Sequence, residues 1–74
     1  MASLPVASGS DAIHAFERAG WRRARQKGGH VCLVKPGVNV NLSFPLHREL
    51  DRGTLRKLIR LAGLPVDGFI AFLQ

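Results

Sequence analysis

The sequence predicts a single α+β domain in the order α-β-β-β-α, in which a three-stranded antiparallel sheet carries helices on one face and a short C-terminal helix follows. Three observations predict it. Apolar residues recur at helical spacing in residues 10–20 and again in residues 51–63. Residues 38–44 alternate between apolar and polar side chains, as in a strand with one buried face. The pairs Gly28-Gly29 and Pro36-Gly37 mark turns, so they divide the region between the helices into three segments.

The first predicted helix begins at Ser8 or Ser10, because a serine hydroxyl can accept a hydrogen bond from a free N–H group of the first turn. Gly20 ends the helix, since glycine readily adopts the left-handed conformation that follows a last turn. The apolar stripe of this helix consists of Ala12, Ile13, Phe16 and Ala19. His14 lies outside the stripe, so we predict that it is exposed.

The three predicted strands are short and occupy residues 21–26, 30–35 and 38–44. In the third strand, the residues predicted to face the core are Val38, Val40, Leu42 and Phe44. The residues predicted to face solvent are Asn39, Asn41 and Ser43. Pro45 ends this strand, because proline has no N–H group to donate to a neighbouring strand. Trp21 and Cys32 are both predicted to belong to the core.

Residues 46–53 are predicted to form a loop that contains His47 and Glu49. Asp51 caps the second helix, Gly63 ends it, and its buried stripe consists of Leu55, Leu58, Ile59 and Ala62. A short third helix is expected from Pro65 to Leu73.

The second helix also carries a basic side. Arg52, Arg56 and Arg60 recur every four residues and share this side with Lys57. Such a stripe is either a solvated helix face or a surface that binds RNA or a protein, and the sequence leaves both interpretations open.

The composition favours a polyanionic partner. Eleven Lys and Arg against five Asp and Glu give a formal net charge of +6, with nucleic acid the first choice and a membrane surface or an acidic protein next. A chain of 74 residues is too short to enclose a deep pocket, so we expect a macromolecular substrate. One cysteine, no signal-peptide pattern and no long apolar stretch predict a soluble cytoplasmic protein. Residues 1–9 are expected to be a flexible leader, and residues 10–74 the domain.

The stretch RQKGGHVCL, residues 25–33, places a histidine behind two glycines and two cations. The backbone N–H groups of Gly28 and Gly29 can approach a phosphate closely, and Arg25 and Lys27 add positive charge in the same turn. Histidine can accept and donate a proton near neutral pH. A histidine at the start of a strand can also be merely structural, and composition alone favours that interpretation of His30.

The segments AGWRRARQKGGHVCLVKPG and GTLRKLIRLAGL, in this order, resemble the HicA family of toxins, which are small mRNA interferases. The resemblance runs from about Asp11 to Phe69. It implies a fold similar to the double-stranded-RNA-binding domain, a catalytic role for His30, and a HicB-like antitoxin that covers His30. Where the family commonly has Gly-Ser-His-His, this chain has Gly28-Gly29-His30-Val31.

With this resemblance, we predict a toxin ribonuclease that cleaves mRNA. The sequence has no cluster of Asp, Glu and His at the spacing of metal ligands, so we expect no metal and no cofactor. The 2′-OH of the RNA would attack the adjacent phosphate, with His30 as general acid and base. The expected RNA-binding residues are Arg25, Lys27, Gly28, Gly29, Arg56 and Arg60. His47 is a weaker candidate for a second acid, base or RNA contact.

Two other functions stay open at this point. A non-catalytic RNA-binding module of the same fold would have the same charge, and His30 would then be incidental. A DNA-binding or ribosome-associated protein would use the basic side of the second helix.

Overall fold

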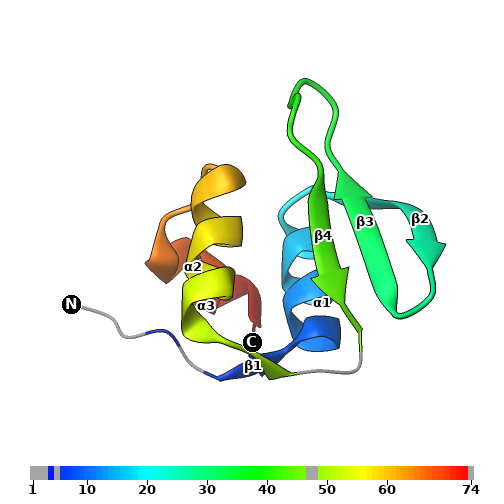
Figure 1. The fold of residues 1–74 in the computed structure, drawn as a ribbon. Coiled ribbons are helices and arrows are strands. Elements are labelled where there is room, and N and C mark those ends of the chain that lie inside the picture. The colour runs from blue at the N-terminus through cyan, green and yellow to red at the C-terminus, as the bar shows by residue number, and fades with distance from the viewer. Residues whose placement is uncertain (1–3, 5, 47–48, 74) are drawn as a thin grey trace.

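The computed structural model describes residues 4, 6–46 and 49–73. Its elements are β1 (Ala7–Ser8), α1 (Gly9–Arg18), β2 (Arg22–Lys27), β3 (His30–Val34), β4 (Leu42–Pro45), β5 (Glu49–Leu50), α2 (Arg52–Leu61) and α3 (Val66–Leu73) (Figure 1). The main sheet has the strand order β2-β3-β4, and all of its pairs are antiparallel. The predicted α+β class, the three-stranded sheet and the α-β-β-β-α order are confirmed.

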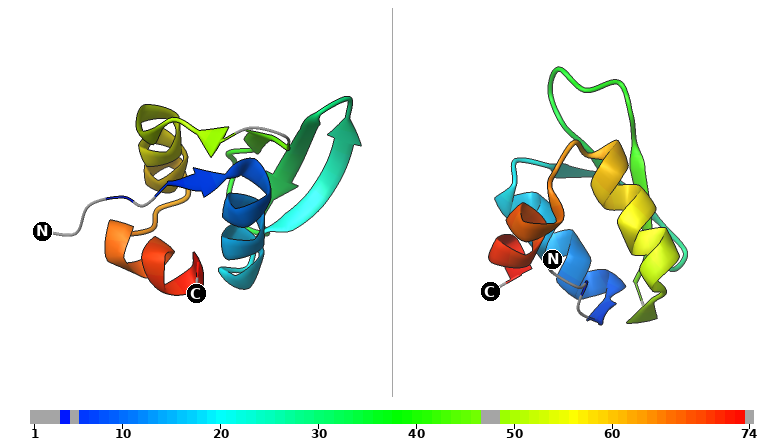
Figure 2. Two further views of the ribbon diagram at one scale, coloured as in Figure 1. Left: turned by 90° about the horizontal axis from the view of Figure 1, so that it is seen from below. Right: turned by 90° about the vertical axis from the view of Figure 1, so that its left-hand side faces the viewer.

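One face of the main sheet packs on the helical layer. Helix α1 contacts β2, β4 and α3, and α2 contacts α3. Figure 2 shows that α1 lies against the sheet, whereas α2 and α3 lie on the β4 side of it, away from β2. The strand residues that face this layer are fully buried; they are Val31, Leu33, Leu42 and Phe44. No described helix covers the other face of the sheet (Figure 1).

The core is centred on Phe16 of α1. Its ring centroid lies 6.4 Å from that of Trp21, 5.3 Å from that of Phe44 and 5.2 Å from that of Phe69. Trp21 reaches this position because Gly20, with φ of 103°, turns the chain back, and the Trp21 N–H donates to the Phe16 carbonyl over 3.0 Å. The prediction that Trp21 belongs to the core is confirmed. So is the exposure of His14.

Both predicted helix caps are present. The Ser8 hydroxyl accepts from the Asp11 N–H over 3.0 Å. Asp51 accepts from the Thr54 hydroxyl over 2.7 Å and from the Thr54 N–H over 2.9 Å. These two hydrogen bonds lower the pKa of Asp51 below its ordinary value of 3.8, because they stabilise its ionised form. The cap therefore fixes where α2 begins.

A two-stranded sheet of β1 and β5 was not expected. Ala7 pairs with Leu50 and Ser8 pairs with Glu49, within stretches assigned to a leader and a loop. Ala7 and Leu4 are each only 3% exposed, and Gly9 is already the first residue of α1. Such a pairing leaves no periodicity in the sequence, because each strand has only two residues.

The third strand of the main sheet is shorter than predicted. It begins at Leu42 rather than Val38, because the last pair between β3 and β4 is Leu33 with Leu42. Residues 38–41 therefore lie beyond the paired part of β3, in the loop that projects from the sheet in Figure 1. The predicted alternation holds in weaker form, since Val38 and Val40 are half-buried while Asn39 and Asn41 are exposed.

Candidate functional site

The β2–β3 hairpin positions His30. Gly28 and Gly29 form its two-residue turn, and Lys27 pairs with His30 across it. Gly28 has φ of 60°, which a residue with a Cβ rarely adopts, so the turn requires glycine there. The predicted turn and the place of His30 at the first position of β3 are confirmed.

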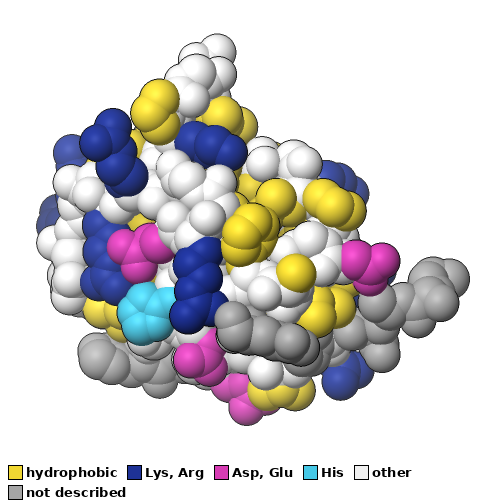
Figure 3. All heavy atoms as spheres, turned by 180° about the vertical axis from the view of Figure 1, so that it is seen from behind, with side chains coloured by type: hydrophobic (Ala, Val, Ile, Leu, Met, Phe, Trp, Pro, Cys, Tyr) yellow, Lys and Arg dark blue, Asp and Glu magenta, His cyan; other side chains and the backbone are white. Residues whose placement is uncertain are grey.

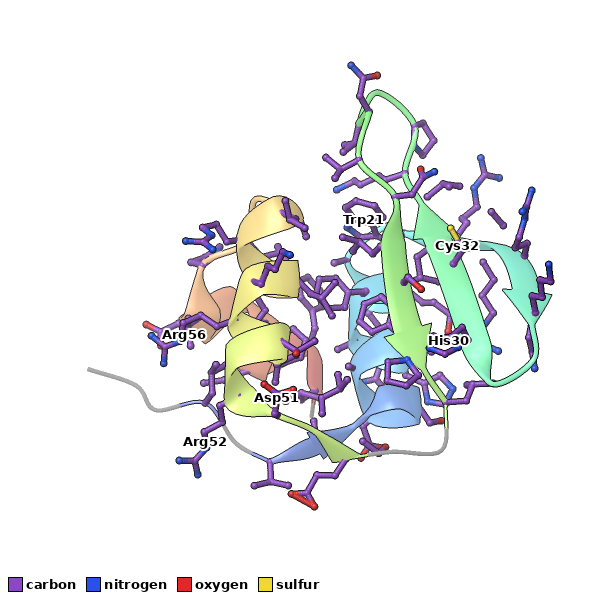
Figure 4. The ribbon with its side chains drawn as sticks, in the orientation of Figure 1. Trp21, His30, Cys32, Asp51, Arg52 and Arg56 are labelled. Carbon is purple, nitrogen blue, oxygen red and sulfur yellow. The ribbon has the colours of Figure 1, made fainter. Side chains whose placement is uncertain are left out.

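The alternation of β3 assigns His30 to the face that no described helix covers. Val31 and Leu33 point into the core, so His30 and Cys32, which alternate with them, point the other way. Figure 4 shows both labelled side chains on β3. Cys32 is only half-buried, so the prediction that it belongs to the core is wrong. The parity of its position relative to Val31 would have corrected that prediction.

Strand register gathers cations around His30. Residues paired across antiparallel strands lie on the same side of the sheet, with Cβ atoms about 4.5–5.5 Å apart. Lys27 pairs with His30 and Arg25 with Cys32, and a bulge between Arg23 and Arg25 brings Arg22 opposite Val34. We call the resulting surface the open face; apart from Val34 and Pro45, it consists of Arg22, Arg25, Lys27, His30, Cys32 and Ser43.

The open face has no acidic residue, because β2, β3 and β4 contain no Asp or Glu. Arg23 lies on the opposite side of β2, where its Nε donates to a Glu17 carboxylate oxygen over 3.3 Å. Within residues 4, 6–46 and 49–73, no side chain forms a hydrogen bond with the exposed His30 ring. The face is therefore cationic, uncompensated by the fold, and open to a ligand.

Backbone contacts hold the strand end that carries His30. His30 pairs with Pro45 of β4, and the Leu46 N–H donates to the Gly29 carbonyl over 2.7 Å. Gly9, at the start of α1, lies against Pro45 so closely that a methyl group on Gly9 would overlap the Pro45 carbonyl. The first turn of α1 thus supports the sheet directly beneath His30.

The basic side of α2 lies apart from His30. The side chains of Arg52, Arg56, Lys57 and Arg60 are all exposed. In Figure 4, Arg52 and Arg56 extend from the outer side of α2, whereas His30 lies beyond β4 on the other side of the molecule. The structure therefore brings Arg25 and Lys27 to His30 but does not bring α2 there. His47 lies outside the described residues.

The surface behind the open face differs in charge. Figure 3 shows acidic and basic side chains next to one another there, together with exposed hydrophobic side chains. Among the residues that the structure describes, no group of three or more His, Cys, Asp or Glu could hold a metal ion. No helix in the described part of the chain is long and apolar enough to cross a membrane.

Sequence reasoning missed three members of the open face, namely Arg22, Cys32 and Ser43. For Cys32 and Ser43 the alternation of strand residues was a sufficient signal. Cys32 is two residues from His30, and Ser43 lies between the core residues Leu42 and Phe44, so both belong to the open face. For Arg22 the sequence contains no such signal, because the face on which it lies depends on a bulge that the residues of β2 do not predict.

Comparison with known protein families agrees with this geometry. A family model described as the HicA toxin of bacterial toxin–antitoxin systems matches residues 9–64. The matched region contains α1, the whole main sheet with the open face, and α2. No match was found among curated proteins.

Proposed function

The chain belongs to the HicA toxin family, and on that premise we propose that it is a metal-independent endoribonuclease that cleaves mRNA with His30 as its proton-transfer residue. Family membership makes it the toxin of a toxin–antitoxin system, with an antitoxin partner and an RNA substrate. The observation that carries the proposal is the open face, where His30 lies among Arg25 and Lys27 and no strand contributes a carboxylate.

The open face suits an RNA backbone. Arg25 and Lys27 bind phosphate oxygens on either side of the cleaved bond, and the backbone N–H groups at Gly28 and Gly29 donate to the same phosphate. These donors stabilise the extra negative charge that the phosphate acquires in the transition state. Strand register fixes the backbone positions of these residues before RNA arrives, so the backbone needs little reorganisation.

The reaction transfers a phosphoryl group within the RNA, from the 5′-oxygen of one nucleotide to the 2′-oxygen of its neighbour. The 2′-oxygen forms a bond to the adjacent phosphorus while the bond from phosphorus to the 5′-oxygen breaks, which leaves a 2′,3′-cyclic phosphate and a free 5′-hydroxyl. The neutral His30 ring accepts the proton of the 2′-hydroxyl and the resulting imidazolium gives it to the departing 5′-oxygen. DNA is not cleaved, because it lacks the 2′-hydroxyl.

A single histidine is enough for this scheme. The position at which the family commonly has a second histidine is held by Val31, whose side chain is fully buried in the core. A histidine there would face the helices rather than the RNA, so its replacement removes no group from the open face.

The partner follows from the same surface. A HicB-like antitoxin that covers His30 would place acidic side chains against Arg22, Arg25 and Lys27, because these cations have no acid on their own sheet. Toxin and mRNA would meet in the cytoplasm once the antitoxin is removed.

The test is cleavage of an unstructured mRNA in excess EDTA, with analysis of the new ends. We expect cleavage that yields 2′,3′-cyclic phosphate and 5′-hydroxyl ends. Cleavage that requires added Mg²⁺ or Mn²⁺, or that yields 5′-phosphate ends, would refute the metal-independent mechanism.

A non-catalytic RNA-binding module is the second candidate, because the cations of the open face would bind RNA whether or not His30 transfers a proton. The two candidates are separated by the same assay. An RNA that binds the purified protein tightly and stays intact would favour the second.

A further inference from the structure

The described cations divide into two kinds. Three are held within the fold: Arg23 by Glu17, Arg18 by the Phe72 carbonyl over 2.7 Å, and Lys35 by the Ala19 carbonyl over 3.2 Å. The other seven make no hydrogen bond or ion pair to another described residue. Of these seven, Arg22, Arg25 and Lys27 belong to the open face. The remaining four form what we call the α2 cluster: Arg52, Arg56, Lys57 and Arg60.

The α2 cluster has a fixed orientation. Leu55, Leu58 and Ile59 are buried on the inner side of α2, so the arginines every four residues must point outward. The acid nearest to them in sequence, Asp51, is engaged by Thr54. Helix α2 itself contains no acidic residue.

This arrangement opposes helix stability. Like charges four residues apart on a helix repel each other, as Arg52 does Arg56 and Arg56 does Arg60. An acidic residue within α2, next to these arginines, would relieve the repulsion, but the helix contains none. A ligand with negative charge would relieve it equally well, which makes the cluster suited to an anionic partner.

The spacing of the cluster fits a nucleic-acid strand. Four residues of a helix rise about 6 Å, so Arg52, Arg56 and Arg60 form a straight row with that repeat. This repeat is comparable to the separation of neighbouring phosphates along an extended single strand. Arginine also suits this task, because its planar head donates two parallel hydrogen bonds to one phosphate.

We infer that the α2 cluster is a second RNA-binding surface, which holds single-stranded RNA outside the segment that the open face cleaves; this inference rests on the proposed function. The molecule measures 34 × 28 × 20 Å, so an RNA must be long enough to pass around it to reach both surfaces. A short oligonucleotide reaches only one. The cluster therefore makes the enzyme prefer long, unstructured RNA over short fragments.

The test compares two pairs of substitutions with the same change of charge. Arg56→Gln/Arg60→Gln removes two cations from the α2 cluster, and Arg22→Gln/Arg25→Gln removes two from the open face. Binding of a long unstructured RNA is measured against salt in a His30→Ala background, so that the RNA stays intact. Cleavage is then measured with His30 present, on the same RNA and on an oligonucleotide of about 4 nucleotides, the lower end of single-strand site sizes.

We expect the α2 pair to make the slope of log affinity against log salt shallower by about 1.4, or 0.7 for each lost contact. With His30 present, it should lower kcat/KM roughly tenfold on the long RNA at low salt and less than twofold on the oligonucleotide. The open-face pair should lower kcat/KM on both substrates. An unchanged salt slope for the α2 pair would overturn the inference, and so would equal losses on both substrates.

These outcomes separate the inference from the proposed function. If neither the unsubstituted protein nor any variant cleaves RNA, but the α2 pair still makes the salt slope shallower, the proposed ribonuclease activity is wrong and the second RNA-binding surface is supported. If RNA is cleaved and the α2 pair weakens only the complex with the antitoxin, α2 is a protein interface and the inference is wrong.

Discussion

The open face and the α2 cluster carry similar charge on different supports. The open face stands on three paired strands and carries His30. The α2 cluster stands on one helix, with long, exposed side chains and no histidine. Charge alone therefore does not distinguish a cleaving surface from a binding surface. What distinguishes the open face is that it holds His30, a side chain able to transfer a proton, on rigidly paired strands.

Rigidity on the open face comes from non-local contacts. His30 is held by its pairs with Lys27 and Pro45, and Pro45 is in turn held by Gly9. A small error in the place of a catalytic group is costly, because proton transfer needs hydrogen-bond distance. The arginines of α2 tolerate motion, because attraction between charges depends weakly on direction. The first prediction tests whether this difference separates the two surfaces.

Substitution His30→Ala should have the largest effect. We expect the rate of RNA cleavage to fall by about 10²–10⁴-fold, the usual contribution of general acid–base catalysis. The thermal midpoint should change little, because the His30 side chain is exposed and makes no hydrogen bond to another described residue. RNA affinity should also persist, since the cations provide binding. The matched control is His14→Ala, which removes an exposed histidine from α1 and should leave the rate unchanged.

Two results would contradict that prediction. A rate that survives the substitution would remove His30 from catalysis and direct attention to His47. A lost rate accompanied by a collapsed midpoint would make His30 structural.

Substitution Gly9→Ala should break the support beneath the open face. The new methyl group overlaps the Pro45 carbonyl, which is backbone and cannot rotate away, so we expect a loss of unfolding free energy of about 3 kcal/mol. The control is Gly63→Ala, where φ of 74° is unfavourable but no atom lies within 4 Å of the added methyl group, so about 1–2 kcal/mol is expected. Urea denaturation measures both. Equal losses would mean that α1 does not brace β4 as described.

Gly9 also illustrates what the sequence could not predict. Its neighbours predict a helix start, and Ser8 caps it as expected, but nothing local indicates that the helix begins against Pro45, more than thirty residues later. The pairing of Ala7 with Leu50 is hidden for the same reason. Elements with their own periodicity and turns were predictable, because local physics determines them. Contacts distant in sequence were not.

The candidate site divides in the same way. Arg25, Lys27, Gly28 and Gly29 join His30 within one hairpin, so the residues around RQKGGHVCL were enough to find it. Arg56 and Arg60 are expected from the sequence to bind the same RNA as His30 because they are cationic, yet in Figure 4 Arg56 extends from the outer side of α2, away from His30. The sequence alone does not show on which side of the fold a charged side chain lies. The packing of Leu55 and Ile59 into the core determines which side of α2 faces outward.

Substitution Arg25→Gln/Lys27→Gln should sharpen the comparison between the surfaces. These side chains flank His30 and contact the phosphate whose charge rises during the reaction. We therefore expect the single-turnover rate at saturating RNA to fall at least about tenfold, in addition to weaker binding. The control is Arg56→Gln/Arg60→Gln, which changes charge equally but should affect that saturated rate much less. If both pairs lower it alike, the open face holds RNA no differently from α2.

The smallest effect concerns how α2 begins. The hydrogen bonds from Thr54 lower the pKa of Asp51 in the folded state, so its contribution to stability is complete above the unfolded-state value of 3.8 and is lost as pH falls through the lower folded value. Asparagine caps a helix about as well as aspartate but does not titrate in this range, so Asp51→Asn keeps the cap and removes the pH dependence. We expect the thermal midpoint of the unmodified protein to fall slightly more than that of Asp51→Asn between pH 5 and pH 2.5, because the other four acidic side chains are the same in both proteins and cancel in the difference. Circular dichroism at 222 nm follows both transitions. Parallel curves would mean that the charge of Asp51 does not stabilise α2, and that a neutral cap at this position serves the helix equally well.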